Sequence, residues 1–226
     1  QILASHPQVA AAGELNFFLM LGKQLRTELS EQWPSSLLRL EQQQLNQFAE
    51  DYLTHISERC GKDKRVTNKM PHNFLWIGLI QRIFPQATFI HCTRNPIDNG
   101  LSIYFQDFSG EHPYAYDLET LGHYYQAYHR LCHHWQQVLP TPIFEMNYEQ
   151  TVADPEGMSR HLLAHCGLEW DDTCLQPHKK QRTVKTASIW QARQAIYDSS
   201  VERWRHYQDH LTPLIQALGP LAKGSV

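Results

Sequence analysis

Residues 87–102 read ATFIHCTRNPIDNGLS, and this stretch decides the fold of the chain. A short apolar run ends at Thr93 and Arg94, a proline follows, and a helical pattern then opens in which Ser102 lies about two turns in. The pattern predicts a buried strand, a tight turn and a helix. Ligands of open α/β sheets bind at the carboxyl ends of the strands, and arginine presents a rigid fork of donors that suits phosphate. The stretch therefore predicts an anion site with Arg94 and Ser102, and it also fits an arginine that only ends a strand.

The same alternation of strands and helices continues on both sides of this stretch. A helix end is expected over residues 1–7, and an irregular segment over 176–187. Strands are expected at 65–69, 88–92 and 142–146, and helices at 16–29, 37–56, 72–84, 95–106, 117–138, 154–167 and 199–218, the last interrupted at 207–211. Strands that alternate with helices predict a parallel sheet covered on both faces. Three strands are few for such a sheet, and a missing N-terminal strand would complete it.

The amino-acid composition indicates a globular chain, and a single domain is expected over residues 1–226. The 226 residues are 42% hydrophobic and 19% charged, enough to bury a real core. The net charge of −3 argues against bulk nucleic-acid binding. No apolar run approaches the roughly 18 residues of a membrane span.

Cysteine and histidine are the residue types that suggest a redox or metal function. The five cysteines are odd in number and contain no Cys-x-x-Cys pair, which indicates reduced thiols. Cys92 and Cys166 have apolar neighbours and are expected in the core. His129 and His133 are spaced to share a helix face, but no Glu stands between them as in H-E-x-x-H and no third ligand is near. The sequence therefore does not favour a metal site.

Two further positions carry candidate chemistry. Glu14 follows Gly13 before a predicted helix, where it is either a general base or a carboxylate favoured by the helix dipole. Lys69, in Asn68-Lys69-Met70-Pro71, closes a predicted strand and points to the same carboxyl edge as Arg94. Two cations from neighbouring strands make a more specific anion signal than one, although a solvated turn lysine also fits.

The segment around Ser188 combines cationic, hydroxyl and aromatic side chains. A loop with Lys185, Ser188, Arg193 and Tyr197 suits closure over a nucleotide, with Tyr197 or Trp190 stacked on the base. An ordinary surface loop fits the same residues.

Taken in order, these motifs resemble the sulfotransferases often fused to tetratricopeptide repeats, akin to the tyrosylprotein sulfotransferases. The resembling stretches span nearly the whole chain: 1–9, 13–15, 68–71, 93–96 with Ser102, 148–149, 153–156, 186–188, 193–194 with Tyr197, and 203–204. The resemblance implies a P-loop-NTPase-like three-layer αβα fold. It also implies that 3′-phosphoadenylyl sulfate (PAPS) is the sulfuryl donor and that no metal is needed.

The resemblance also assigns roles to residues. It implies that Arg94 and Ser102, eight residues apart, hold the 3′-phosphate of the donor, and that Ser188 and Tyr197 are further donor contacts.

For catalysis, the resemblance implies that Glu14 is the general base and that Lys69 contacts the sulfuryl group. Related cytosolic enzymes use a histidine near the Lys69 segment, which makes His72 the second candidate for the base and His6 the third. Positioning and cationic stabilisation dominate such a transfer, as in phosphoryl transfer.

Two departures from the family pattern lead to expectations. The family's phosphosulfate loop, which reads like Pro-Arg-Ser-Gly-Thr-Thr, should precede residue 1, so the chain is expected to be N-terminally truncated, without its first strand and loop. It is then expected to transfer sulfate poorly unless those residues are restored. The Golgi enzymes pair cysteines where this chain has Ala11 and Thr67, which favours a cytoplasmic, bacterial-type enzyme.

Other functions and partners remain open at this point. A non-catalytic binding module of the same fold is one alternative, and a nucleotide kinase of similar architecture is another, although neither its phosphate loop nor its magnesium carboxylate is seen. The acceptor hydroxyl belongs to a peptide tyrosine, a saccharide or a small metabolite. Residues 37–56 either pack internally or offer a face for a homodimer, and upstream tetratricopeptide repeats are expected in the parent protein.

Overall fold

The computed structural model describes residues 1–29, 33–61, 64–108, 112–176 and 197–223. The chain divides into two compact units, and each is described by itself. Unit 1 comprises residues 1–88, 137–142 and 171–185, and unit 2 comprises residues 89–136, 143–170 and 186–226. The expectation of a single domain over the whole chain stays a prediction.

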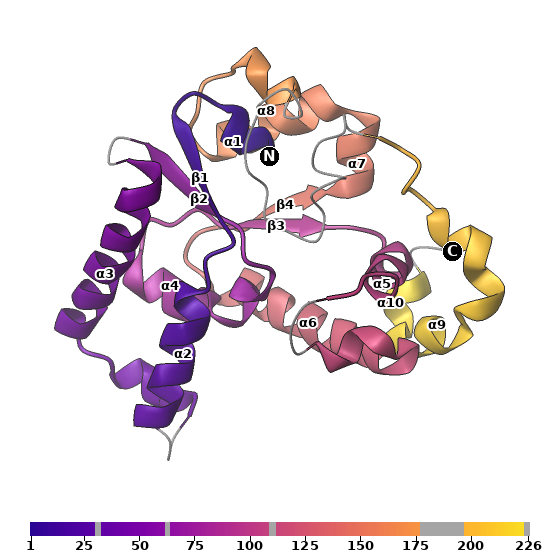
Figure 1. Cartoon of the computed structure of the whole chain (residues 1–226), viewed down its shortest axis with the longest axis horizontal. Helices are drawn as coiled ribbons and strands as arrows, with labels where there is room; N and C mark the ends of the chain where they lie inside the picture. The colour runs from indigo at the N-terminus through magenta and orange to yellow at the C-terminus, as the bar shows by residue number, and fades with distance from the viewer. Residues whose placement is uncertain (30–32, 62–63, 109–111, 177–196, 224–226) are drawn as a thin grey trace. The chain divides into compact units, whose positions relative to one another are not determined.

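Unit 1 contains a pair of parallel strands, β1 (Val9–Gly13) and β2 (Arg65–Asn68) (Figure 1). Strand β2 was predicted, whereas β1 was not, because alanines 10–12 do not have the branched or aromatic side chains that mark a strand. The pairing register shifts between Ala11 and Gly13, so the end of β1 is irregular.

The helices of unit 1 follow the predicted segments with two corrections. Their bounds are α1 (Ile2–Ser5), α2 (Phe17–Glu28), α3 (Gln42–Cys60) and α4 (Ile77–Ile83). The expected helix over 37–56 starts later, since residues 35–39 form a separate 3₁₀ turn, η2, and Glu41 with Gln44 makes a capping box for α3. The expected helix over 72–84 is divided into a 3₁₀ turn, η3 (Pro71–Leu75), and α4.

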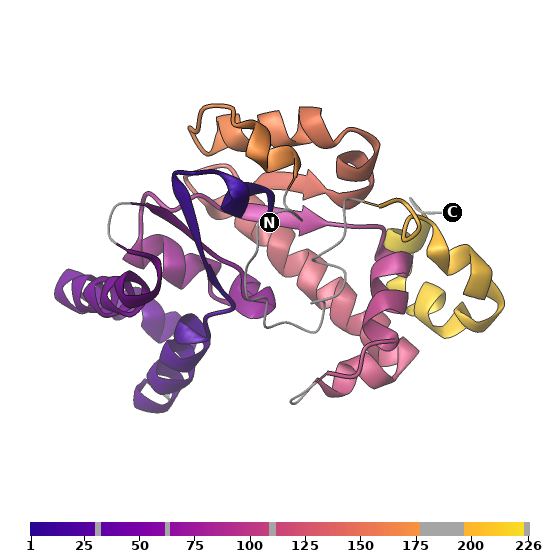
Figure 2. The same ribbon diagram turned by 45° about the horizontal axis from the view of Figure 1, so that its top comes forward.

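Unit 2 contains the second parallel pair, β3 (Ile90–Thr93) and β4 (Phe144–Asn147), with Ile90 opposite Phe144. After β4, the helices α7 (Tyr148–Ala153) and α8 (Pro155–His165) pack against it (Figure 2). Asp154 caps α8, because its Oδ1 accepts a hydrogen bond from the Gly157 backbone N–H at 2.9 Å.

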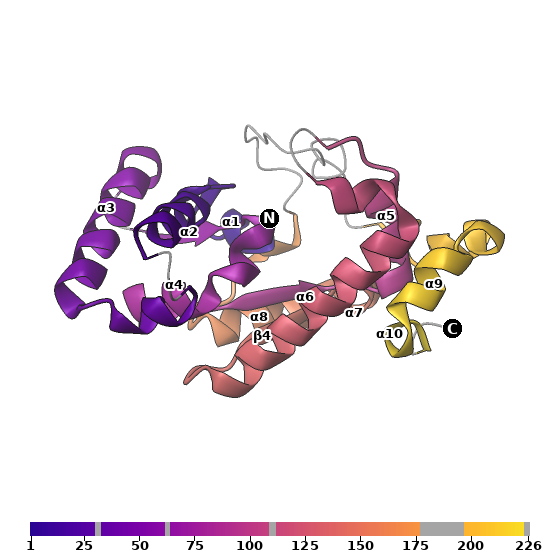
Figure 3. The same ribbon diagram turned by 90° about the horizontal axis from the view of Figure 1, so that it is seen from below.

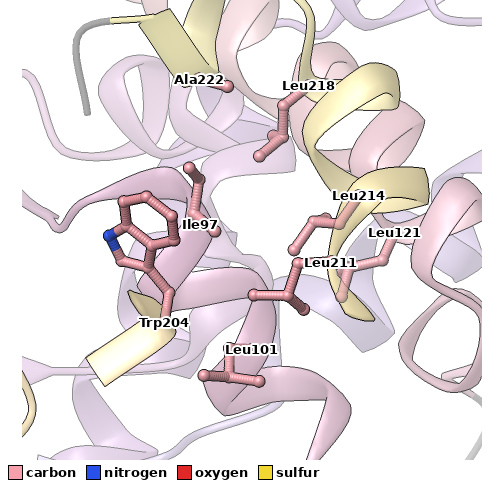
Figure 4. Close-up of a cluster of buried hydrophobic side chains, with 8 residues drawn as sticks. All are labelled: Ile97, Leu101, Leu121, Trp204, Leu211, Leu214, Leu218 and Ala222. Atoms are coloured by element: carbon pink, nitrogen blue, oxygen red, sulfur yellow. The ribbon is translucent and has the colours of Figure 1, made fainter. Parts of the chain in front are cut away.

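The core of unit 2 forms where α5 (Pro96–Tyr104) meets the C-terminal helices. These are the 3₁₀ helix η8 (Arg203–His210), α9 (Thr212–Leu218) and α10 (Pro220–Lys223), and Figure 3 shows α9 beside α5. The long helix α6 (Leu118–Val138) adds Leu121. Figure 4 shows the cluster: Ile97, Leu101, Leu121, Trp204, Leu211, Leu214, Leu218 and Ala222. The helix expected over 199–218 begins only at Arg203, and its first part, η8, is 3₁₀ rather than α. The break before α9 falls at Leu211, the last residue of the interruption predicted at 207–211.

The α/β class and the parallel pairing are confirmed. In the described backbone the strands pair as β1 with β2 and β3 with β4, so the strand before Lys69 pairs with that before Glu14 and not with that before Arg94.

The cysteine and metal expectations can also be compared with the structure. In the described structure none of the five cysteines forms a disulfide; Cys132 and Cys174 are buried, whereas Cys92 is exposed and Cys166 only partly buried. The expectation that Cys92 and Cys166 lie in the core was therefore wrong, because apolar sequence neighbours do not decide which face of a strand or helix end a side chain occupies. Among the described residues, no group of three or more His, Cys, Asp or Glu is arranged to hold a metal ion. Within those same ranges, no helix has the length and apolar character to cross a bilayer.

Candidate active site

Glu14 and Lys69 form an ion pair at the carboxyl ends of β1 and β2. Gly13 ends β1 with φ +77°, a backbone conformation that suits glycine, and its carbonyl accepts a hydrogen bond from the Lys69 backbone N–H at 2.9 Å. This backbone bond brings the side chains of Glu14 and Lys69 together, and Lys69 Nζ donates to Glu14 Oε1. The sequence named both residues but did not predict their direct contact.

The pair is open to solvent. The Glu14 side chain is 30% exposed and the Lys69 side chain 64% exposed. A surface ion pair contributes little to stability, so the fold does not depend on this one. An accessible carboxylate beside an ammonium group can accept a proton from a hydroxyl while the ammonium faces a developing negative charge.

The two histidines considered as alternative bases have other surroundings. His6 is 3% exposed and caps α1, and its Nδ1 accepts a hydrogen bond from the Gln8 backbone N–H at 3.2 Å. This contact gives His6 a structural role in the turn that follows α1. His72 lies in η3, is partly buried, and has its ring 6.2 Å from that of Phe74.

Arg94 lies where β3 ends and α5 is about to begin, as the sequence predicted. The start of α5 is well defined, because Asn95 Oδ1 accepts from the backbone N–H groups of Ile97 and Asp98 at 2.9 and 3.1 Å and Pro96 occupies the first turn. The Asn95 backbone N–H in turn donates to Glu149 Oε1 at 2.8 Å. The turn that carries Arg94 is thus tied to the start of α7.

The Arg94 side chain is largely covered, with 19% of its surface exposed. Its Nη2 donates to the Ser200 carbonyl at 2.5 Å, and its guanidinium carbon lies 5.1 Å from the centre of the Tyr148 ring. Asp98 Oδ1 lies 4.0 Å from Nη2. Sequence reasoning did not name Asp98 as a site residue, and it quoted Tyr148 only as part of a motif.

The three other residues predicted to contact the donor, Ser102, Tyr197 and Ser188, have different surroundings. Ser102 is exposed on α5. Tyr197 lies beside Tyr148, whose hydroxyl donates to the Tyr197 carbonyl at 3.1 Å. Ser188 lies outside the described residues.

Burial raises the pKa of two groups around Arg94. Burial raises the pKa of the Asp98 carboxyl, while the Trp204 backbone N–H and then the Arg94 guanidinium lower it to a smaller extent. The pKa of the Tyr148 phenol is also raised, and burial is the largest cause of this shift. Tyr148 therefore stays neutral and keeps the proton that it donates.

Comparison with known proteins places the chain in a family. The model of the sulfotransferase family matches residues 1–172, more than half of the chain. The chain therefore belongs to the sulfotransferase family, and the resemblance seen in its motifs is confirmed.

Two relatives are similar to this chain in sequence. An uncharacterised protein of Aquifex aeolicus is 38% identical over 227 residues, which cover 96% of this chain and 30% of that protein. The omega-hydroxy-beta-dihydromenaquinone-9 sulfotransferase Stf3 of Mycobacterium tuberculosis is 27% identical over 169 residues, 69% of this chain and 41% of that protein. The chain thus spans less than half of the length of either relative.

Solved structures agree on the fold. A sulfotransferase domain from the curacin biosynthetic pathway has a TM-score of 0.68 and 15% identity, over 99% of this chain and 90% of that one. A sulfotransferase domain of the Synechococcus PCC 7002 olefin synthase has a TM-score of 0.62 and 19% identity, over 90% of this chain and 80% of that one. At such identities the likeness concerns the fold, which is P-loop-like.

Proposed function

We propose that this protein transfers a sulfuryl group from PAPS to an acceptor hydroxyl, with Glu14 as the general base. The observation that carries the proposal is the exposed Glu14–Lys69 pair at the carboxyl ends of two paired parallel strands. Membership of the sulfotransferase family supports the reaction class.

The proposed roles of Glu14 and Lys69 follow from the proton and the negative charge that move during sulfuryl transfer. The acceptor oxygen forms a bond to sulfur as the bond from sulfur to the phosphate oxygen breaks, and adenosine 3′,5′-bisphosphate leaves. The Glu14 carboxylate accepts the proton of the acceptor hydroxyl, and the Lys69 ammonium stabilises the negative charge on the sulfuryl oxygens and the leaving phosphate. The proposal needs no metal, because a sulfuryl group carries less charge than a phosphoryl group.

The donor nucleotide is assigned to residues of unit 2. Arg94 and Ser102 would hold its 3′-phosphate, with Ser188 and Tyr197 as further contacts. The position of Arg94 directly before α5 supports this assignment, since helix starts favour anions.

The acceptor and the compartment are also proposals. The name of Stf3 describes a hydroxyl-bearing substrate for that relative, which supports an alcohol acceptor here beside a peptide tyrosine, a saccharide or a small metabolite. Five cysteines that form no disulfide in the described structure support a reducing, cytoplasmic location. A homodimer and upstream tetratricopeptide repeats belong to the same proposal.

The test is sulfate transfer by the full-length protein from radiolabelled PAPS to a panel of hydroxyl acceptors: a tyrosine peptide, a saccharide, a phenol and a long-chain alcohol. Lys69→Met should lower the rate by about 10²-fold or more, since it removes a preorganised charge from the transition state. Lys23→Met, a change of an exposed lysine of α2, is the matched control and should leave the rate unchanged. Transfer that is equally fast in both variants would refute the role of Lys69, and no transfer to any acceptor would contradict the proposed reaction.

A further inference from the structure

Asp98 is a buried carboxylate on α5, next to the hydrophobic cluster of unit 2. Its side chain is fully covered, and its neighbours along α5, Ile97 and Leu101, belong to the apolar cluster of Figure 4. Among the described residues, its Oδ2 atom has no hydrogen-bond partner. Burying a carboxylate is costly unless it is fully paired, so packing alone does not explain an acid at this position.

The contacts that Asp98 does make lead to the C-terminal segment. Its Oδ1 accepts a hydrogen bond from the Trp204 backbone N–H at 2.8 Å. Four residues earlier, the Ser200 carbonyl accepts from Arg94 Nη2. Residues 200–204 are therefore held at one end by Arg94 and at the other by Asp98.

The backbone between these two contacts is bent. Glu202 has φ +54°, the left-handed conformation that non-glycine residues adopt at a cost, and it caps η8. Strain of this kind persists only where the surroundings impose it, and here the imposed bend directs one carbonyl to Arg94 and one N–H to Asp98.

Arg94 is consequently fixed from three directions. The Ser200 carbonyl holds Nη2, the Tyr148 ring lies against the guanidinium, and the carboxylate of Asp98 attracts it from within the core. Tyr148 is itself held, because its hydroxyl donates to the Tyr197 carbonyl. Two of these three contacts depend on Asp98, one directly and one through the segment that it anchors.

We propose that Asp98 is a positioning residue for Arg94, which it orients toward the 3′-phosphate of the donor both by its charge and by anchoring residues 200–204. This inference rests on the proposed function, in which Arg94 contacts that phosphate. Asp98 itself touches no ligand in the proposal.

The experiment measures binding of two nucleotides to the full-length protein by calorimetry: adenosine 3′,5′-bisphosphate and adenosine 5′-monophosphate, which has no 3′-phosphate. Asp98→Ala removes both the charge and the acceptor for Trp204 and should weaken the bisphosphate by about 10-fold or more. The monophosphate should change by about 2-fold or less. Asp98→Asn keeps an acceptor at Oδ1 and should recover part of the loss.

A combined variant shows whether Asp98 acts through Arg94. In an Arg94→Ala background, Asp98→Ala should cause no further loss of bisphosphate affinity. Ser159→Ala is the control for a purely structural change, because this buried hydroxyl of α8 bonds only the Pro155 carbonyl in the described structure. It should not alter the discrimination between the two nucleotides.

The outcomes separate this inference from the proposed function. If Arg94→Ala binds the bisphosphate as well as the unchanged protein does, the donor-site assignment fails. If Arg94→Ala loses affinity but Asp98→Ala does not, or if Asp98→Ala weakens both nucleotides equally, only the positioning role is overturned. If Asp98→Ala does not fold, Asp98→Asn is the deciding variant. A loss of roughly 3-fold in affinity for the bisphosphate but not for the monophosphate supports the positioning role, and bisphosphate binding as tight as or tighter than that of the unchanged protein refutes it.

Discussion

Replacing Glu14 by glutamine separates a catalytic carboxylate from a structural one. The change keeps the shape of the side chain but removes its charge and its capacity to accept a proton. Since the Glu14 and Lys69 side chains are 30% and 64% exposed, water screens their ion pair. The loss of the pair should therefore lower the free energy of unfolding by about 1 kcal/mol at most.

The expected effect on the reaction is much larger. Loss of a general base lowers a rate by roughly 10²–10⁴-fold, which equals about 3–5 kcal/mol of activation free energy. No surface ion pair could produce a change of that size through stability alone. The excess of the kinetic effect over the stability effect is thus the signature of a base.

The assay combines urea unfolding with single-turnover sulfate transfer at saturating PAPS, so that chemistry rather than product release is measured. Glu28→Gln, at the other end of α2, is the matched control, because its carboxylate is also exposed and accepts a hydrogen bond only from Gln24 in the described structure. A decrease of less than about 10-fold in the transfer rate of Glu14→Gln would refute the assignment of the base. In that case His72→Ala would be measured next.

Three further predictions follow from the fold. Gly122→Ala should destabilise the protein by about 1–3 kcal/mol in urea unfolding, because the new Cβ would lie 2.5 Å from Ala217 Cβ and 3.1 Å from the backbone of α9; an unchanged midpoint would contradict this packing. Asn95→Ala should cost about 0.5–2 kcal/mol, since it removes the cap of α5, whereas Asn95→Asp should retain most of the stability. Burial raises the pKa of the Asp98 carboxyl above its value in the unfolded chain, so the folded protein loses stability as the pH rises from the unfolded pKa through the folded one. Asp98→Asn should therefore be the more stable form near pH 7, with a difference in free energy of unfolding that shrinks toward about pH 4. A difference that grew toward acid pH would show the opposite sign and contradict the burial argument.

Much of the fold could be predicted because its signals are local. The apolar run before Arg94 and the Asn-Pro step after it specify a strand, a cap and a helix within a few residues, and β3 and α5 lie there. Strand β1 escaped prediction for an equally local reason: three alanines have neither the shape that favours a strand nor an alternating polar pattern. The pairing with β2 that stabilises β1 comes from residues more than 50 positions away.

The same distinction applies to the site. Glu14 and Lys69 each follow a strand, so the sequence could name them, but their contact depends on which strands pair, and that is decided by the whole unit. Sequence reasoning expected Lys69 and Arg94 at the same carboxyl edge, on neighbouring strands. The strand that pairs with β2 is β1, which the sequence did not predict.

Asp98 shows why a buried site residue is the hardest to find from sequence. By position it is an acid in the first turn of a helix, where the helix dipole favours any carboxylate and where most such residues face solvent. Its distinguishing property is the contact with the Trp204 backbone, 106 residues away, and no local pattern encodes a backbone partner at that distance. The nearest signal was its spacing of four residues from Arg94, over which the turn before α5 brings Asp98 Oδ1 to 4.0 Å from Arg94 Nη2. An acidic residue that follows a candidate anion-binding arginine by four positions should therefore be tested as the residue that positions the arginine, before it is assigned to the solvent-exposed face of the helix.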